Sequence, residues 1–243
     1  MCGRATVVDP NGIESRNFGF SRRFIPSDWK PRYNLNPREE IPAVHLDAES
    51  GERVLRGMHW NFIPAHIGSA DKRAAFDAQY STFNAKIERV DTAPSFRQAW
   101  RKQRCLVVVD GIIEWVGARG KKVPHLIKSR SGRAFAMAGL WSGWRDESGS
   151  DEQWSCAVVI GPSDDWYSRF HHRMALLLKP ELYDSWLDPE LDSPESILRL
   201  LAESPFPCAD ELEAIPISRR VNNPSYDAPD CLEPAAEGLT PGA

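Results

Sequence analysis

One stretch near the middle of the chain most restricts the fold. Residues 105–109 form an apolar and largely β-branched run, Asp110 and Gly111 interrupt it, and residues 112–116 resume it. β-branched side chains pack well on a pleated surface, and a glycine between two such runs marks a turn or a bend. We therefore predict two buried strands that meet at Asp110 and Gly111.

The remaining strand-like runs are short and numerous. We expect further strands at residues 4–8, 41–46, 53–62, 125–128, 134–141, 155–160 and 175–178, with a hairpin turn at Gly51. Helices are expected after Ser95 as N-cap, from Pro180, and from Ser193 and Pro194, where an N-cap and a first-turn proline follow each other. Many strands without regular strand–helix alternation predict an α+β fold with a mainly antiparallel sheet.

Three segments give weaker signals. Residues 13–24 are helix-like but polar, residues 31–37 are expected to be irregular because prolines flank them, and residues 64–80 are expected to form a surface loop. We also expect the acidic, proline-containing end of the chain to be a disordered tail over residues 235–243.

Composition excludes several classes of protein. The chain has 243 residues, enough for one large domain, and lacks both a signal peptide and the run of about 18 apolar residues that a membrane span needs. Its five cysteines are widely spaced without a CxxC pair, which argues against a disulfide framework and against a zinc site. We expect an intracellular protein with no membrane partner, no metal and no cofactor, cytoplasmic or nucleoid-associated if it is bacterial. Nothing in the sequence requires an oligomer, so we expect a monomer.

Net charge alone does not predict nucleic-acid binding. The formal charge is −4, and the segment from Asp227 to the end carries four acidic and no basic residues, so residues 1–226 sum to zero (−4 minus −4). Basic residues cluster at positions 22–23, 97–104, 119–122 and 219–220. These clusters fit a locally basic groove, and they equally fit solvated surface.

The start of the chain carries unusual chemistry. If Met1 is removed, Cys2 holds a free α-amine beside its thiol, and an α-amine has an ordinary pKa of about 7.7–8.0. An aldehyde can condense with this amine to an imine, and the thiol can then close a five-membered thiazolidine ring. The alternative is that cysteine follows the initiator methionine by chance.

Three polar residues in apolar or tightly turned contexts are candidates for acid–base work or positioning. Glu114 lies between Ile113 and Trp115, where burial would raise the pKa of its carboxyl, unless the strand lies at an edge and the side chain points to water. Asn84 could orient an amine or a substrate oxygen, or could simply form a turn. His171 precedes an apolar run and could shuttle protons, or could be a surface or capping histidine.

Familiar catalytic motifs are missing from the sequence. It contains no G-x-S-x-G, no P-loop, no G-x-G-x-x-G and no H-E-x-x-H. Hydrolase-elbow, nucleoside-triphosphate, dinucleotide and zincin functions therefore have no support in the sequence.

Eight short segments resemble one known family when they are taken in order. They are MCGR at residues 1–4, RYNLNP at 32–37, WNFIP at 60–64, NAKIE at 84–88, FR at 96–97 with RCL at 104–106, DGIIEW at 110–115, HHRM at 171–174 and VNNP at 221–224. In this order they are similar to the SRAP (SOS response-associated peptidase) family, and the resemblance covers residues 2–234.

The resemblance implies a fold and an activity. The fold would be a single α+β domain with a curved, mainly antiparallel sheet and flanking helices. The activity would be DNA repair, through binding of single-stranded DNA and a thiazolidine crosslink between Cys2 and the ring-opened aldehyde of an abasic site, with an accompanying abasic-site lyase activity.

The resemblance also implies roles for individual residues. The catalytic set would be Cys2, Asn84, Glu114 and His171. The DNA-binding set would hold phosphates through Arg4, Lys86 and Arg173, offer apolar or stacking surfaces for bases on Trp60 and Trp115, and use Pro37 as a wedge.

The sequence departs from the family pattern at a few positions. Lys86 stands where arginine is usual, Asn61 where glycine is usual, Ala175 where proline is usual, and His172 where aspartate is common. A lysine can hold a phosphate only as a point charge, so these departures affect DNA affinity and loop geometry more than the chemistry.

Two other functions stay open from the sequence. One is a peptidase whose N-terminal cysteine removes Met1 or cuts other chains. The other is a non-catalytic single-strand binding module, for which affinity would not depend on a lesion and would fall steeply with salt.

Overall fold

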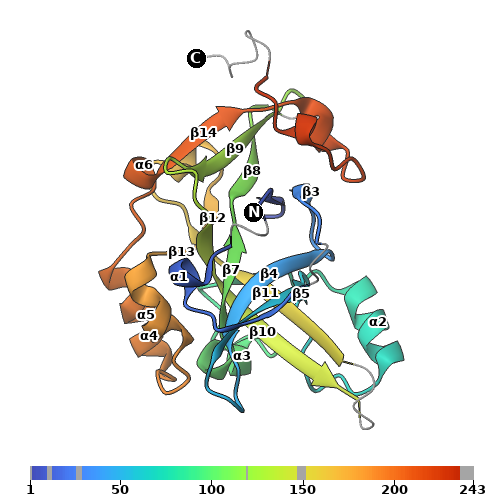
Figure 1. Cartoon of the computed structure of the whole chain (residues 1–243), viewed down its shortest axis with the longest axis vertical. Helices are drawn as coiled ribbons and strands as arrows, with labels where there is room; N and C mark the ends of the chain where they lie inside the picture. Colours follow the sequence, from blue (N-terminus) through green and yellow to red (C-terminus); the bar gives the residue numbers. More distant parts are fainter. Residues whose placement is uncertain (1, 10–12, 26–28, 119, 147–151, 236–243) are drawn as a thin grey trace.

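The computed structural model describes residues 2–9, 13–25, 29–118, 120–146 and 152–235, and its strands form two sheets (Figure 1). The five-stranded sheet has the order β14-β9-β8-β1-β3. Its strands are β1 (Ala5–Val7), β3 (Arg32–Leu35), β8 (Gly111–Val116), β9 (Val123–Ser129) and β14 (Leu212–Pro216).

The larger, nine-stranded sheet has the order β12-β11-β10-β7-β4-β5-β2, with β13 on β10 and β6 on β11. Its strands are β2 (Arg22–Phe24), β4 (Glu40–Leu46), β5 (Arg53–His59), β6 (Asn84–Lys86), β7 (Arg104–Val109), β10 (Phe135–Arg145), β11 (Glu152–Pro162), β12 (Arg173–Ala175) and β13 (Leu177–Leu178). Most pairs in both sheets are antiparallel, and β2–β5, β6–β11 and β5–β11 are parallel. The predicted α+β class with mainly antiparallel pairing is confirmed.

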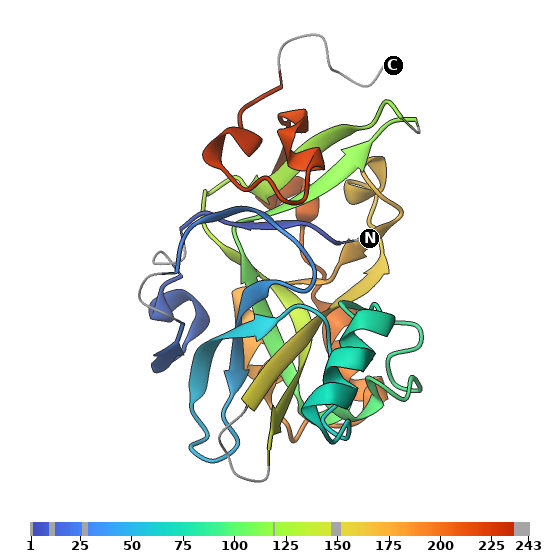
Figure 2. The same cartoon turned by 90° about the vertical axis from the view of Figure 1, so that its right-hand side faces the viewer.

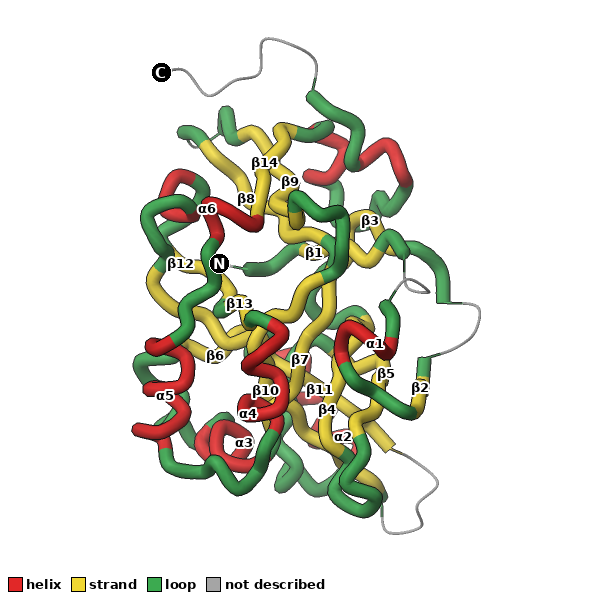
Figure 3. The backbone as a smooth tube through the Cα atoms, turned by 60° about the vertical axis from the view of Figure 1, so that its left-hand side comes forward, coloured by secondary structure: helices red, strands yellow, loops and turns green. Residues whose placement is uncertain are grey.

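Short helices flank the sheets. They are α1 (Ser15–Phe18), α2 (Ala70–Gln79), α3 (Arg97–Lys102), α4 (Tyr183–Leu187), α5 (Pro194–Glu203) and α6 (Cys208–Glu211), with 3-10 turns η1 (Tyr167–Arg169), η2 (Pro180–Leu182), η3 (Arg219–Asn222) and η4 (Pro229–Cys231). Helices α3, α4 and α5 lie together at one end of the large sheet (Figure 3), and α2 lies on the opposite side from α4 and α5 (Figure 1). No helix in the described part of the chain has the length and apolar character that crossing a bilayer requires.

The predicted break at Asp110 and Gly111 is where the chain passes from one sheet to the other. Strand β7 ends at Val109 in the large sheet, and β8 begins at Gly111 in the small one. The Asp110 carboxylate accepts hydrogen bonds from the Thr6 hydroxyl and from the Val8 N–H at 2.5 Å. A Cβ on Gly111 would lie 2.6 Å from both Thr6 Oγ1 and a Leu126 methyl, so only glycine fits this corner.

Several local predictions are confirmed. The hairpin at Gly51 is the antiparallel pair β4–β5. The helix that starts after Ser193 is α5, and the Ser193 hydroxyl accepts the N–H of Ser196 at 3.3 Å, as an N-cap does.

Other local predictions are wrong, and tertiary partners explain most of them. Residues 64–80 contain α2, whose buried residue is Arg73, stacked 4.8 Å over the Trp144 ring. Residues 31–37 contain β3, because this segment pairs with β1, and the Asp227 carboxylate binds N–H groups on its other edge. Helix α3 has Phe96, not Ser95, at its N-cap position.

Two further predicted segments are divided. Only Ser15–Phe18 of residues 13–24 is helical, and Arg22–Phe24 is a strand. Residues 175–178 fall into β12 and β13. Ala235, the first residue of the predicted tail, still donates its N–H to Pro216 O at 2.9 Å, and residues 236–243 lie outside the described part of the chain.

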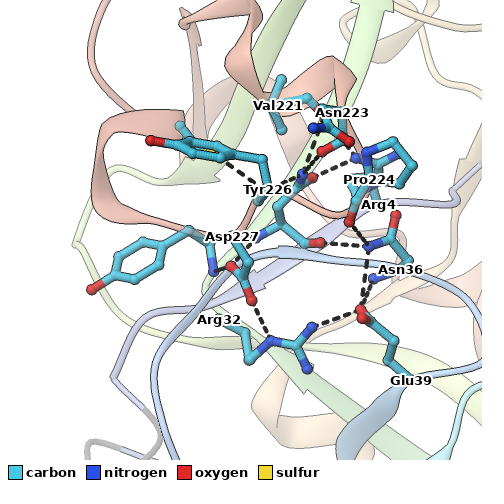
Figure 4. A network of polar contacts seen from close by, with 12 residues as sticks. Arg4, Arg32, Asn36, Glu39, Val221, Asn223, Pro224, Tyr226 and Asp227 are labelled. Carbon is cyan, nitrogen blue, oxygen red and sulfur yellow. Dashed lines mark hydrogen bonds and ion pairs between the residues drawn. The ribbon is translucent and has the colours of Figure 1, made fainter.

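A polar network ties the C-terminal segment to the start of the chain (Figures 2 and 4). Asn34 is fully buried, and its Nδ2 donates to the carbonyls of Val221, Asn223 and Tyr226 at 3.3, 3.0 and 2.8 Å. Its Oδ1 accepts from Arg4, which also donates to Val221 O at 2.8 Å. Residues 32–37 therefore contact residues 221–224 in the fold, although the two segments are far apart in the sequence.

Asn34→Ala should destabilise the fold by about 2–4 kcal/mol, because the main-chain carbonyls of Asn223 and Tyr226 lose the Asn34 donor and the Arg4 guanidinium loses the Asn34 acceptor. Urea unfolding followed by tryptophan fluorescence measures this. Asn223→Ala is the matched control: its exposed side chain makes one local bond, to Ser225 N. Equal losses from the two variants would contradict the structural role assigned to Asn34.

Candidate functional site

Cys2 lies inside the molecule, immediately before β1. Strand β1 is held on both sides, with Ala5 opposite Leu35 of β3 and opposite Ile112 of β8. The Cys2 side chain is fully buried, and its Sγ lies 3.8 Å from the Met137 sulfur. Burial raises the pKa of the Cys2 thiol well above its usual range, and the charge on Glu114 raises it further. The thiol is therefore protonated at neutral pH and stands near a carboxyl group.

Asn84 contacts Cys2 directly. It begins β6, which pairs in parallel with β11, and its Nδ2 donates to the main-chain carbonyl of Cys2 at 2.7 Å. Its Oδ1 is buried and has no hydrogen-bond partner among the described residues. A buried carboxamide oxygen without a donor costs about 1–3 kcal/mol, so this atom is a ready acceptor for an N–H that enters the site.

Glu114 is buried in the middle of the small sheet. Strand β8 has β1 on one side and β9 on the other, where His125 is opposite Glu114. Its side chain is 3% exposed, so the alternative of an edge strand with Glu114 in water is wrong. Burial raises the pKa of this carboxyl to about 7, although the Tyr167 hydroxyl, which donates to Oε1 at 3.2 Å, acts in the opposite direction. A carboxyl of this kind can both give and take a proton near neutrality.

His171 follows the turn η1 and is half-buried. Its main-chain N–H donates to Tyr167 O at 3.2 Å, and its ring Nδ1 accepts the N–H of Arg173 at 2.9 Å. The His172 ring stacks on it with the centroids 4.4 Å apart. Burial lowers the pKa of His171 below its ordinary value, although the hydrogen bond to the main chain of Arg173 acts in the opposite direction, so the neutral imidazole is favoured at pH 7.

The structure brings Cys2, Asn84 and Glu114 together, and it joins His171 to them through the main chain of Tyr167. Asn84 binds the Cys2 carbonyl, and the charge on Glu114 raises the pKa of the Cys2 thiol. Tyr167 donates its hydroxyl to Glu114, and its main-chain carbonyl accepts the N–H of His171. The arrangement offers a buried thiol, a carboxamide acceptor, a carboxyl that titrates near neutrality and a neutral imidazole. Such a set can hold an amine, transfer protons and exclude water while a covalent bond forms.

The predicted DNA-binding residues differ in the contacts that they already make within the protein. Lys86 is exposed at the end of β6. Arg173 binds both carboxylate oxygens of Glu88, which holds the pKa of that carboxyl at about 2, and it also donates to Ile160 O at 3.3 Å. A phosphate that binds Arg173 must therefore compete with Glu88.

Arg4 and Trp115 form one unit beside the site. The Arg4 guanidinium lies 5.3 Å from the centre of the Trp115 ring, and the Trp115 indole N–H donates to Asn222 Oδ1 at 2.7 Å. Trp115 as a whole residue is only partly buried. Pro37 is half-buried in the turn that follows β3.

Trp60 corrects one prediction. The sequence suggested a stacking surface for bases, but the Trp60 side chain is fully buried, and its indole N–H donates to Phe83 O at 3.1 Å. The Phe83 ring packs against it edge-on, with the centroids 6.2 Å apart. Trp60 is therefore part of the core and presents no face on which a base could stack.

Tyr167, Glu88 and Asn222 contact the predicted residues but were missed as functional candidates. Glu88 and Asn222 lie inside segments that carry the family resemblance, so their positions could have been flagged. Tyr167 lies four residues before His171 and belongs to none of the recognised segments. No local sequence pattern indicates that its hydroxyl contacts Glu114 in β8. In the described ranges, no group of three His, Cys, Asp or Glu residues is arranged to hold a metal ion.

The fold and the buried cluster define an α+β domain that keeps Cys2 in its interior, beside Asn84 and Glu114. A family model for SOS response associated peptidase (SRAP) matches residues 1–224, and the chain belongs to this family.

Relatives and solved structures resemble most of the chain. The abasic site processing protein YoqW of Bacillus subtilis is 28% identical over 234 residues, which are 96% of this chain and 99% of that protein. The abasic site processing protein HMCES of Gallus gallus is 27% identical over 237 residues, covering 87% of this chain and 68% of the relative. A crystal structure of a protein from Bacteroides thetaiotaomicron superposes with a TM-score of 0.79 at 22% identity, over 96% of this chain and all of the other, which supports the fold.

Glu114→Gln should stabilise the protein at pH 8 and have little effect at pH 4. The folded carboxyl has a pKa of about 7 and the ordinary value is 4.5, so between these pH values the native state holds more protons than the unfolded state. Stability is therefore lost as pH rises through this window, by about 3 kcal/mol in total. Chemical denaturation of both proteins from pH 4 to 8 measures the difference.

Glu211→Gln serves as the control for that series, because Glu211 is exposed at the end of α6. It should change stability little at any pH. A Glu114→Gln effect of the same size at pH 4 and pH 8 would show that ionisation of Glu114 does not oppose folding.

Proposed function

We propose that the protein is a DNA-repair enzyme that captures abasic sites in single-stranded DNA as a thiazolidine on Cys2. One observation carries the proposal: Cys2 is buried between a carboxamide whose oxygen lacks a donor among the described residues and a carboxyl with a pKa of about 7. The names of the relatives, abasic site processing proteins, support abasic DNA as the substrate.

The reaction begins with loss of Met1, a residue that lies outside the described part of the chain. The freed Cys2 amine adds to the aldehyde of the ring-opened deoxyribose, and loss of one water gives an imine. The thiol then adds to the imine carbon, its proton passes to the nitrogen, and the five-membered ring closes. Overall one C–N and one C–S bond form and one water leaves, so no oxidant or cofactor is consumed.

Each residue of the cluster has a place in this sequence. Asn84 already binds the Cys2 carbonyl, and its Oδ1 would accept an N–H of the new amine. Glu114 would donate a proton to the departing water and take one from the thiol, since both of its forms are present near pH 7. Neutral His171 would move protons at the sugar, and would support strand cleavage by β-elimination when the imine does not close.

DNA binding would follow the cationic and aromatic groups beside the cluster. Lys86 and Arg173 would hold phosphates, with Arg173 leaving Glu88 as the strand arrives. Arg4, which lies over the Trp115 ring, would hold a further phosphate, Trp115 would stack a neighbouring base, and Pro37 would act as a wedge. A base stacked on an aromatic ring gains about 1–3 kcal/mol whatever its sequence, which suits a lesion binder. Preference for single strands and a monomeric state remain predictions.

The wild-type protein should form a heat-stable crosslink with single-stranded DNA that carries one abasic site, and Cys2→Ala should form none. A denaturing gel detects the crosslink. Cys231→Ala is the matched control, because Cys231 is also a buried free cysteine but lies in the smaller core cluster. Cys2→Ser retains the amine but has no thiol, so it should trap DNA only when borohydride reduces the imine.

Two outcomes of that experiment would contradict the proposal. One is an equal, heat-stable band from wild type and Cys2→Ala, which would mean that the crosslink does not involve the Cys2 thiol. The other is an unreduced, heat-stable band from Cys2→Ser, which would mean that sulfur is not needed for ring closure.

A further inference from the structure

Tyr167 is a buried residue beside the cluster to which the chemistry above gives no role. Its side chain is fully buried in η1, and the ring packs against Trp166 and Phe170 with centroid distances of 6.4 and 6.2 Å. The hydroxyl donates to Glu114 Oε1 at 3.2 Å. Burial and the nearby Glu114 charge raise the pKa of Tyr167 well above its usual range, so the phenol stays protonated and acts as a donor.

The turn that carries Tyr167 is itself fixed by hydrogen bonds. Asp164 Oδ1 accepts the N–H of Tyr167 at 2.6 Å, and Asp164 O accepts the N–H of Ser168 at 2.9 Å. Tyr167 O accepts the N–H groups of Phe170 at 2.9 Å and His171 at 3.2 Å. The Tyr167 side chain is therefore bonded to Glu114, and its main chain to His171.

We propose that Tyr167 is a positioning residue that holds Glu114 by Oε1, leaves Oε2 for proton transfer, and fixes the distance between Glu114 and His171. The inference deepens the proposed function and rests on it. A carboxyl that rotates freely presents either oxygen in many orientations, whereas one held by a buried phenol presents a single oxygen to the reacting atoms. The same hydrogen bond favours the ionised carboxylate, which is the form that takes the thiol proton.

Other titratable groups also lie around Glu114. Cys2 lies ahead of β1, His125 is opposite on β9, Lys122 lies in the loop between β8 and β9, and His171 follows η1. The α-amine that Cys2 gains on loss of Met1 adds a cation on the same side. Of the described residues, Tyr167 makes the side-chain hydrogen bond to the Glu114 carboxylate.

Tyr167→Phe tests the proposal, because it removes the hydroxyl and keeps the ring. The Glu114 titration midpoint, followed by ¹³C NMR of labelled glutamate without DNA, should rise by about one pH unit. The single-turnover rate of crosslinking should then fall by about tenfold or more at pH 6. At pH 9, where Glu114 is ionised in both proteins, the rate of the variant should recover in part but stay severalfold below that of the wild type, because the carboxylate is no longer held by Oε1. Affinity for single-stranded DNA with a tetrahydrofuran in place of the abasic sugar should not change, because this analogue has no aldehyde to react.

Tyr183→Phe is the matched control. Tyr183 is a buried tyrosine in α4 that stacks on Phe18 at 5.8 Å, and its loss of a hydroxyl should leave the Glu114 midpoint and the rate profile unchanged.

A second measurement gives an answer even if the Tyr167→Phe variant does not fold. The Tyr167 Cζ resonance should shift with the Glu114 midpoint in otherwise unaltered protein, and that step should disappear in Glu114→Gln.

The outcomes separate the two proposals. A Glu114 midpoint that is the same in wild type and Tyr167→Phe, or a rate profile that does not move with the midpoint, overturns the role of Tyr167. No crosslink from wild type overturns the proposed function, and the NMR titration still decides whether Tyr167 holds Glu114.

Discussion

The pairing of β1 between β3 and β8 is the constraint on which the site depends. It places Ala5 opposite Leu35 and Ile112 and thereby fixes Cys2, three residues earlier, in the interior. The same pairing covers one side of β8 and buries Glu114. The buried Glu114 carboxyl opposes folding when it is ionised, so it lowers the stability of the fold near neutral pH. The same burial places a group that can donate and accept a proton at that pH in the interior.

Much of the fold follows from local sequence. The β-branched runs on either side of Asp110 and Gly111 became β7 and β8, and Ser193 capped α5, because period, turn chemistry and capping act over a few residues. The candidate catalytic residues were likewise visible, since Glu114 interrupts an apolar run and Asn84 lies in a recognisable segment.

What the sequence could not predict depends on contacts between distant segments. Helix α2 is polar, and its buried Arg73 is stabilised by Trp144, which lies far along the chain. The sequence suggested that Trp60 is available to bases, whereas the structure buries its side chain against Phe83. The hydrogen bond from Tyr167 to Glu114 spans 53 residues and leaves no local pattern, so only the three-dimensional structure reveals it.

The most direct test of the central claim is the position of the covalent bond on the protein. Wild-type protein crosslinked to abasic single-stranded DNA would be digested with nuclease and trypsin, treated with iodoacetamide, and sequenced by tandem mass spectrometry. The account predicts a peptide that starts at Cys2, lacks Met1, carries the sugar less one water, and has a thiol that iodoacetamide cannot alkylate. An adduct on a lysine, a retained Met1, or an alkylated Cys2 within the adduct would contradict it.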